Sequence, residues 1–317
     1  MKNIEFNSFN YFYSVHKQDA EALVSEVLQS GKYIRDKHNS LLEQKLCNLC
    51  NRDFALTTAS CTDAIFFALK AGGIKEGDEV ILTSFSYIAS LSPVLMCGAV
   101  PVFADINHET LVLDIENIES LINKKTKAII FVQLFGNTTN LKKLQKLCHD
   151  SEIVLIEDAA QGLGSSCNDL KGASQGDISC ISFDPTKIVS AFGTGGAVLT
   201  NNEKYYNKLK MLIHHGRNDN GEFEVLGYNS KIPEINAALI NLQLSFLDKI
   251  IDETNKIANQ YILKLSRIAE VKFVKIPENN LSTYHKFVII VQNRDELKRH
   301  LLQNGIETRI HYQPLLH

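Results

Sequence analysis

The chain has 317 residues, of which 44% are hydrophobic and 22% are charged, and its net charge is −3. This is an ordinary globular balance with enough apolar residues for a large core, and the length allows one large domain and a smaller one. So weak a net charge gives no electrostatic reason to expect a nucleic acid or an anionic membrane as a partner. We therefore expect neither.

The first ten residues contain no apolar segment of the kind found in secretory signals. The most apolar stretch, residues 87–104, is interrupted by serine, glycine and two prolines, so a helix and a strand explain it better than a membrane span. Seven scattered cysteines indicate reduced thiols and a cytoplasmic protein. Cys47 and Cys50 form a CxxC without a second pair at zinc spacing, which favours core-facing cysteines over a metal or redox site.

The N-terminal region is expected to contain an arm and two helices. Residues 1–17 carry five aromatic side chains without a regular period, which predicts an irregular arm that packs on a neighbouring domain or subunit. Residues 20–28 have helical periodicity and end at Ser30-Gly31, a typical C-cap. Residues 41–49 form a second amphipathic pattern.

Strand and helix patterns then alternate, which predicts an α/β fold with a mostly parallel sheet and helices on both faces. The predicted strands are residues 55–58, 79–83, 100–104, 128–134, 153–156, 178–183 and 197–200. The predicted helices are residues 62–71, 88–97, 115–122, 141–149 and 205–213.

The C-terminal region predicts a smaller α+β unit. Residues 233–265 have the apolar spacing of one long helix, with Pro233 at its start. Strand patterns at 271–274, 287–291 and 307–312 and a helical pattern at 294–304 follow. We expect a large domain over residues 1–245 and a small one over 246–317. Because so few elements close a core poorly, we expect the small domain to be truncated.

The strongest chemical signal lies where two buried strands end in polar residues. Strand 153–156 leads into Asp158 and Gln161, and strand 178–183 leads into Lys187. Ligands of parallel sheets bind at the carboxyl ends of the strands, so these residues and Ser182 are expected to face one cleft. A lysine and a carboxylate with hydroxyl groups beside them suit pyridoxal phosphate, which needs an amine and a partner for its pyridine nitrogen.

Each of these residues also has a simpler interpretation. Lys187 follows a Pro-Thr turn and would by itself be a solvated turn residue. Asp158 would by itself be a helix N-cap. Its neighbour Glu157 must point to the opposite face of the strand, so only one of the two carboxylates can meet the cofactor.

Two further segments follow predicted strands. Ser60-Cys61-Thr62-Asp63 fits a helix-capping box, and the same geometry leaves N–H groups that can hold a phosphate. Tyr87 either stacks on a flat ring or packs in the core.

The motifs IEDAAQ, SFDPTK and GTGG resemble the signature blocks of the DegT/DnrJ/EryC1/StrS family of sugar aminotransferases. Other segments resemble family blocks in the same order, among them ASCTDAIFFAL, GDEVILTSFSYIAS, LGYNSKIPEINAALINLQL and GIETRIHYQPLLH. The resemblance covers nearly the whole chain. It implies a fold type I, aspartate aminotransferase-like enzyme that uses pyridoxal 5'-phosphate and its amine form.

The resemblance also assigns roles to individual residues. Lys187 matches the lysine that binds the cofactor covalently, Asp158 the partner of the pyridine nitrogen, and Gln161 a residue near the ring hydroxyl. Ser182 and Thr62 match residues that contact the phosphate, with the backbone of Cys61 beside them, and Tyr87 matches the aromatic residue that stacks on the ring. Asn229 matches a residue that contacts the phosphate of the neighbouring subunit. The positions that match substrate-side residues are Lys231, His311 and Tyr312.

The match to Asn229 implies a homodimer with shared active sites. At two positions the sequence departs from the family pattern, with Cys61 in place of glycine and Lys231 in place of arginine. Arginine offers a bidentate fork that lysine lacks.

The implied function is transfer of an amino group, from glutamate, to a keto carbon of a nucleotide-linked deoxysugar. Such amino sugars serve O-antigen, polysaccharide or antibiotic synthesis. Two alternatives stay open. One is a dehydratase of the related branch, in which histidine replaces the lysine, so that Lys187 argues against it. The other is an inactive or regulatory protein on the same fold, suggested by Cys61 and the short C-terminus.

Overall fold

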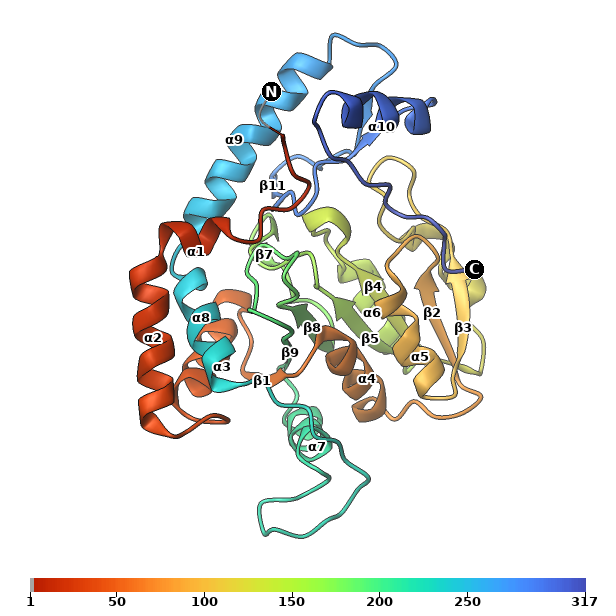
Figure 1. The fold of residues 1–317 in the computed structure, drawn as a ribbon. Helices are drawn as coiled ribbons and strands as arrows, with labels where there is room; N and C mark the ends of the chain where they lie inside the picture. The colour runs from red at the N-terminus through yellow and green to blue at the C-terminus, as the bar shows by residue number, and fades with distance from the viewer. Residues whose placement is uncertain (1–2) are drawn as a thin grey trace.

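The computed structural model describes residues 3–317, so the first two residues of the predicted arm lie outside it. A seven-stranded sheet lies at its centre (Figure 1). The strand order across the sheet is β1 (Phe54–Thr58), β9 (Gly196–Thr200), β8 (Ile178–Ser182), β5 (Val154–Asp158), β4 (Thr126–Val132), β2 (Glu79–Thr83) and β3 (Val100–Ala104). All neighbours pair in parallel except β9, which is antiparallel to both β1 and β8. The predicted mostly parallel sheet is therefore confirmed.

Two apolar clusters cover the two faces of this sheet. Cys180 of β8 belongs to one cluster and the next residue, Ile181, to the other. Because successive strand residues point to opposite faces, the clusters lie on opposite sides. Helices α4 (Cys61–Ala71) and α6 (Lys142–Asp150) contribute to the first cluster, with α5 (Ser92–Met96) and α7 (Glu203–Ile213). Helices α3 (Lys37–Cys50) and α8 (Glu234–Leu244) contribute to the second, and α2 (Lys17–Ser30) packs on α8.

Several predicted elements of the large domain differ from the observed ones. The predicted helix 115–122 is two 3₁₀ turns, η2 (Ile115–Asn117) and η3 (Glu119–Leu121). The side chain of Asp114 accepts hydrogen bonds from the N–H of Glu116 and from the amide of Asn117, which competes with a regular helix. The predicted helix 88–97 is a 3₁₀ turn, η1 (Ile88–Ser90), followed by the short α5, which has Pro93 in its first turn.

The predicted single helix 233–265 is two helices, α8 and α9 (Leu247–Leu265), separated at Ser245 and Phe246. Apolar periodicity runs through this break, so the pattern did not reveal it. The predicted domain division at residue 245 coincides with the break and stays a prediction.

The C-terminal unit contains α9, α10 (Arg294–Gln303) and the antiparallel pair β10 (Lys272–Phe273) and β12 (Ile289–Ile290). The predicted strand 307–312 does not form. In its place Ile306 makes one bridge to Ile4 of the N-terminal arm. A three-stranded sheet of two-residue strands was not predicted, because such strands are too short to show a period. It joins β11 (Asn280–Leu281), β6 (Ser166–Cys167) and β7 (Leu170–Lys171).

The N-terminal arm lies against this C-terminal unit and ends in a short helix, α1 (Tyr11–Val15). The N–H of Ile4 donates to the carbonyl of Gly305, and the N–H of Glu307 donates to the carbonyl of Ile4. The arm therefore packs on the C-terminal unit of its own chain, one of the two arrangements that the sequence left open. Across residues 3–317, no helix is long and apolar enough to span a membrane.

Candidate active site

The carboxyl ends of β1, β2, β4, β5 and β8 lie at one edge of the sheet, because these five strands are parallel. The segments that follow them carry most of the predicted site residues. Ser60 and Thr62 follow β1, Tyr87 follows β2, Gln161 follows β5 and Lys187 follows β8. The sheet therefore brings together side chains that are far apart in the sequence.

Asp158 ends β5 and is 3% exposed. Its Oδ2 accepts a hydrogen bond of 2.7 Å from Ser90 Oγ, and its Oδ1 accepts one of 3.1 Å from the N–H of Ala160. Burial raises the pKa of Asp158; both hydrogen bonds and the charge of Lys187 oppose this rise. Lys187 therefore acts electrostatically on Asp158, as expected for two groups of one site.

Lys187 lies in the turn after β8. The turn is rigid because Ser182 Oγ accepts from the N–H of Asp184, and the carbonyl of Asp184 accepts from the N–H of Lys187 at 2.9 Å. Asp184 Oδ1 also accepts from the hydroxyl and the N–H of Thr186. The side chain of Lys187 is half-buried. No carboxylate of the described chain lies within 4.0 Å of its amine.

Gln161 connects the sheet edge to the C-terminal segment. Its Oε1 accepts from the N–H of Phe135 at 2.8 Å, and its Nε2 donates to the hydroxyl of Tyr312 at 3.0 Å. Phe135 lies in η4 (Leu134–Gly136) after β4 and stacks on Tyr312 with an interplanar angle of 10°. Burial raises the pKa of Tyr312 to about 12, so the hydroxyl is neutral and both donates and accepts. The structure thus brings Gln161 and Tyr312 together.

The first turn of α4 offers N–H groups to an anion. The first four N–H groups of a helix have no intrahelical partner. Ser60 Oγ accepts a hydrogen bond from the N–H of Asp63, and the Ser60 carbonyl accepts one from the N–H of Ala64. The N–H groups of Cys61 and Thr62 remain for a phosphate. The predicted cap at Ser60 is confirmed, although Asp63 does not reach back to it as in a full capping box: its carboxylate accepts from the hydroxyl of Ser230.

The side chain of Cys61 lies in the core and does not extend into this turn. Burial holds the pKa of its thiol well above the usual range, so the thiol is neutral. Gly196, at the start of β9, passes so close that a Cβ there would lie 2.6 Å from the N atom of Cys61. These observations suit a narrow cradle of main-chain N–H groups, which is how proteins bind the phosphate of pyridoxal phosphate. The donors, the buried carboxylate and the lysine therefore fit that cofactor.

Other predicted residues lie around this centre. The side chain of Tyr87 is 61% exposed and its ring lies 6.5 Å from that of Tyr312. Core packing of Tyr87, the simpler interpretation, is therefore wrong. Asn229 is exposed, and its Oδ1 accepts from the amine of Lys231 at 2.9 Å. His311 stacks on Phe6 of the arm.

Sequence reasoning missed Ser90 and Ser86, whose hydroxyls lie 2.9 Å apart beside Asp158. Both are buried polar residues after β2, which is a signal for a site residue. It also missed Lys286, which lies near Lys187 but follows no long strand.

The sequence matches the DegT/DnrJ/EryC1/StrS aminotransferase family over residues 15–317. The chain belongs to this family. One relative is the UDP-2-acetamido-2-deoxy-3-oxo-D-glucuronate aminotransferase of Pseudomonas aeruginosa, 30% identical over 93% of this chain and 82% of its own length.

Two solved structures support the fold. DesV of S. venezuelae, in complex with a ketimine intermediate, has a TM-score of 0.97 and 29% identity over 100% of this chain and 85% of its own. NtdA of Bacillus subtilis, with bound cofactor PMP, has a TM-score of 0.92 and 28% identity, and the match covers 100% of this chain and 74% of NtdA. The predicted fold type I architecture, the aminotransferase class and the pyridoxal phosphate cofactor are confirmed by these comparisons.

Proposed function

We propose that this protein moves an amino group from glutamate to a keto carbon of a nucleotide-linked deoxysugar, with Lys187 and Asp158 as its catalytic residues. The carrying observation is the placement of Lys187 and a buried, incompletely paired Asp158 at one edge of the sheet. Fold alone would not support this function, because one fold serves many reactions. The relative from P. aeruginosa, whose name is that of a nucleotide-sugar aminotransferase, supports the substrate class.

Bound pyridoxal phosphate supplies an electron-accepting ring that stabilises negative charge at the carbon bearing the amine. The protein positions this chemistry. Asp158, held by Ser90 and the N–H of Ala160, keeps a proton on the pyridine nitrogen. Lys187 binds the cofactor and, when free, moves protons as a base. The N–H groups of Cys61 and Thr62 and the hydroxyl of Ser182 hold the phosphate, and Tyr87 lies on the open side for stacking.

We further propose a cytoplasmic homodimer in which Asn229 contacts the phosphate bound by the other subunit, with Lys231 beside it. Support comes from exposure: Asn229 is exposed, and its main chain pairs with His214 rather than with the sheet edge of its own site. Lys231 and His311 are then substrate-side residues. The hydroxyl of Tyr312, which accepts from Gln161, belongs to the same side.

The test is the visible absorption spectrum of the purified protein with pyridoxal phosphate, before and after glutamate is added. We expect the band of the lysine-bound cofactor, and we expect glutamate to convert it to the pyridoxamine form. The spectrum should recover when a nucleotide-linked keto sugar is added. A folded protein without the band would contradict the proposal and favour an inactive relative. A band that glutamate leaves unchanged would indicate another amino donor or another reaction, and product analysis would separate dehydration from amine transfer.

A further inference from the structure

Five basic side chains, Lys187 among them, gather at the site. They come from three segments that are distant in the sequence, and together we name them the cationic cluster: Lys187, His285, Lys286, Arg309 and His311. Contacts connect the cluster to the site, because Lys286 and His311 both contact the Phe6 ring and the neighbour of His311, Tyr312, accepts from Gln161. The charge of Lys187 also lowers the pKa of Lys286, of His285 and of His311. The lowered pKa leaves both histidines neutral near neutral pH, so the like charges that repel one another are those of the two lysines and Arg309. Their repulsion is unfavourable without an anion.

The N-terminal arm fixes Lys286 in this cluster. The amine of Lys286 donates to Asn7 Oδ1 at 3.2 Å and lies 4.8 Å from the centre of the Phe6 ring. The guanidinium of Arg309 lies 5.7 Å from the same ring, and His311 stacks on it at 5.8 Å. Neutral and aromatic groups therefore hold the three basic side chains, and none of these contacts neutralises a charge.

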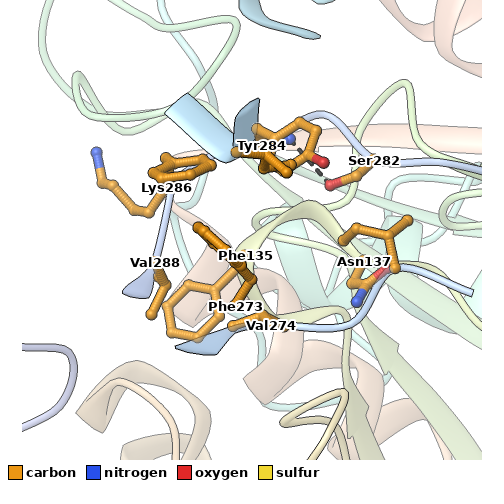
Figure 2. Close-up of a pocket in the computed structure, with 11 residues that line it drawn as sticks. Phe135, Asn137, Phe273, Val274, Ser282, Tyr284, Lys286 and Val288 are labelled. Carbon is orange, nitrogen blue, oxygen red and sulfur yellow. Dashed lines mark hydrogen bonds between the residues drawn. The ribbon is translucent and has the colours of Figure 1, made fainter. Parts of the chain in front are cut away.

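An apolar cavity borders Lys286 on its other side. Figure 2 shows Phe135, Phe273 and Val288 around this cavity, with the amine of Lys286 directed away from it. The walls remove water from the stem of Lys286 but offer no counter-ion. As a result, burial first and the charge of Lys187 second lower the pKa of Lys286 to about 8.

Among the residues that the structure describes, the acidic groups near the cluster form no ion pair with its two lysines. Asp184 raises the pKa of Lys286, but its Oδ1 accepts from Thr186. Glu307 accepts from the N–H of Phe6. In residues 3–317 no carboxylate lies within 4.0 Å of the amine of Lys286 or of Lys187. A substrate anion would supply the missing negative charge.

We propose that Lys286, with His311 beside it, binds an anionic oxygen group of the substrate that reacts at Lys187. This inference rests on the proposed function and adds a binding residue to it. A carboxylate and a phosphate share the required chemistry, since both accept charge-assisted hydrogen bonds from an ammonium group. The two possible sources are the side-chain carboxylate of glutamate and the diphosphate of the nucleotide sugar.

The experiment compares the wild-type holoenzyme with Lys286→Met. Glutamate and alanine are titrated while the conversion of the cofactor band is followed, and binding of UDP and dTDP is measured by calorimetry. If glutamate is the source, its apparent Kd should rise about 10- to 100-fold, the range of a hydrogen bond to a charged group, while that for alanine stays unchanged. If the diphosphate is the source, binding of UDP or dTDP should weaken instead. Unchanged binding of glutamate, UDP and dTDP would overturn the inference.

Two controls make the result specific. Lys275→Met removes an exposed lysine that pairs with Glu109 outside the cluster, and it should alter none of these constants. Lys286→Arg should retain binding, because arginine keeps the positive charge. If glutamate does not convert the cofactor band of the wild-type protein, glutamate is not the amino donor. The measurements with UDP and dTDP then still test Lys286.

The pH dependence gives a second readout that does not need Lys286→Met to fold. Only the protonated amine attracts an anion, so wild-type affinity for the anion should fall as the pH rises through about 8. Because a bound anion stabilises the protonated amine, the affinity will fall at a somewhat higher pH than in the free protein. The other groups around it are His285, His311, Arg309, Glu307, Asp184 and Lys187. Lys286→Arg should remove the decline; a decline that persists in this variant would contradict the role of Lys286.

Discussion

Two adjacent carboxylates on opposite faces of strand β5 have different numbers of hydrogen-bond partners. Glu157 and Asp158 are 0% and 3% exposed. Glu157 accepts from the N–H groups of Gln175 and Gly176, from the hydroxyl of Ser179 and from the amide of Gln133. Within residues 3–317, Asp158 accepts only from Ser90 and Ala160. A buried carboxylate that the fold satisfies completely stabilises structure, whereas one left with spare acceptor capacity can bind a ligand.

Arg52 completes this contrast. Its guanidinium donates to the hydroxyl of Ser179 at 2.7 Å and lies 3.8 Å from a carboxylate oxygen of Glu157. Burial lowers the pKa of Arg52, and the charge of Glu157 opposes this. Asp158 has no permanent cation at this distance, so a protonated ring nitrogen would take that place. The difference teaches that partner count, rather than burial, separates the carboxylate that we propose as functional from the structural one.

Lys187→Ala tests the functional side with the largest expected effect. We expect transamination to fall by about 1000-fold or more, near the upper range for a positioned proton-transfer group. Turnover and the cofactor spectrum measure this, and light scattering should show an unchanged oligomer. Lys275→Ala is the control. Near-normal turnover in Lys187→Ala would show that another group does the chemistry.

Glu157→Ala tests the structural side. It leaves Arg52 buried without its carboxylate, which should lower the free energy of unfolding by about 3–5 kcal/mol. Urea unfolding of the protein measures the loss. Adding Arg52→Met to the same chain should recover part of it, because the uncompensated charge is then gone. A loss below about 1 kcal/mol would mean that the network around Glu157 is dispensable.

Asp158→Asn should have the opposite character. Because burial raises the pKa of Asp158, its ionised form destabilises the cofactor-free protein above the unfolded pKa, about 3.9. We therefore expect Asp158→Asn to be as stable as wild type or more so at pH 7, with the gain shrinking as the pH is lowered. Affinity for pyridoxal phosphate should fall about tenfold or more, the equivalent of about 1.4 kcal/mol. Unfolding of the cofactor-free protein measures the stability, and equilibrium dialysis measures the affinity. A large loss of stability would show that Asp158, like Glu157, has a structural role.

Ser90→Ala should have the smallest effect. It removes the hydroxyl that donates to Asp158, so the pKa of Asp158 should rise further. Affinity for the cofactor should then weaken by about 0.5–1 kcal/mol, and its decline on acidification should begin at higher pH. Ser92→Ala is the matched control in the same segment, since its exposed hydroxyl bonds only to the carbonyl of Ile88. Equal pH profiles for Ser90→Ala and Ser92→Ala would remove Ser90 from the site.

The sequence was enough for most of the sheet and for the two residues that we propose as the centre of the site. Strands β2 and β3 have the predicted bounds, and Ser60 caps α4 as predicted, because periodicity and capping depend on residues within one or two turns. Asp158 and Lys187 could be found because they directly follow buried strands. The opposite orientation of Glu157 also followed from the period of a strand.

Tertiary structure alone decided the rest. Ser90 reaches Asp158 across 68 residues of chain, and Gln161 reaches Tyr312 across 151. Lys286 is held by Asn7 of the arm, 279 residues away, and the arm forms its bridge with Ile306 just before the segment predicted as a strand. Such contacts depend on where irregular segments pack against the sheet in the folded protein. Local periodicity carries no information about that, because irregular segments have no repeat and their partners are distant in sequence.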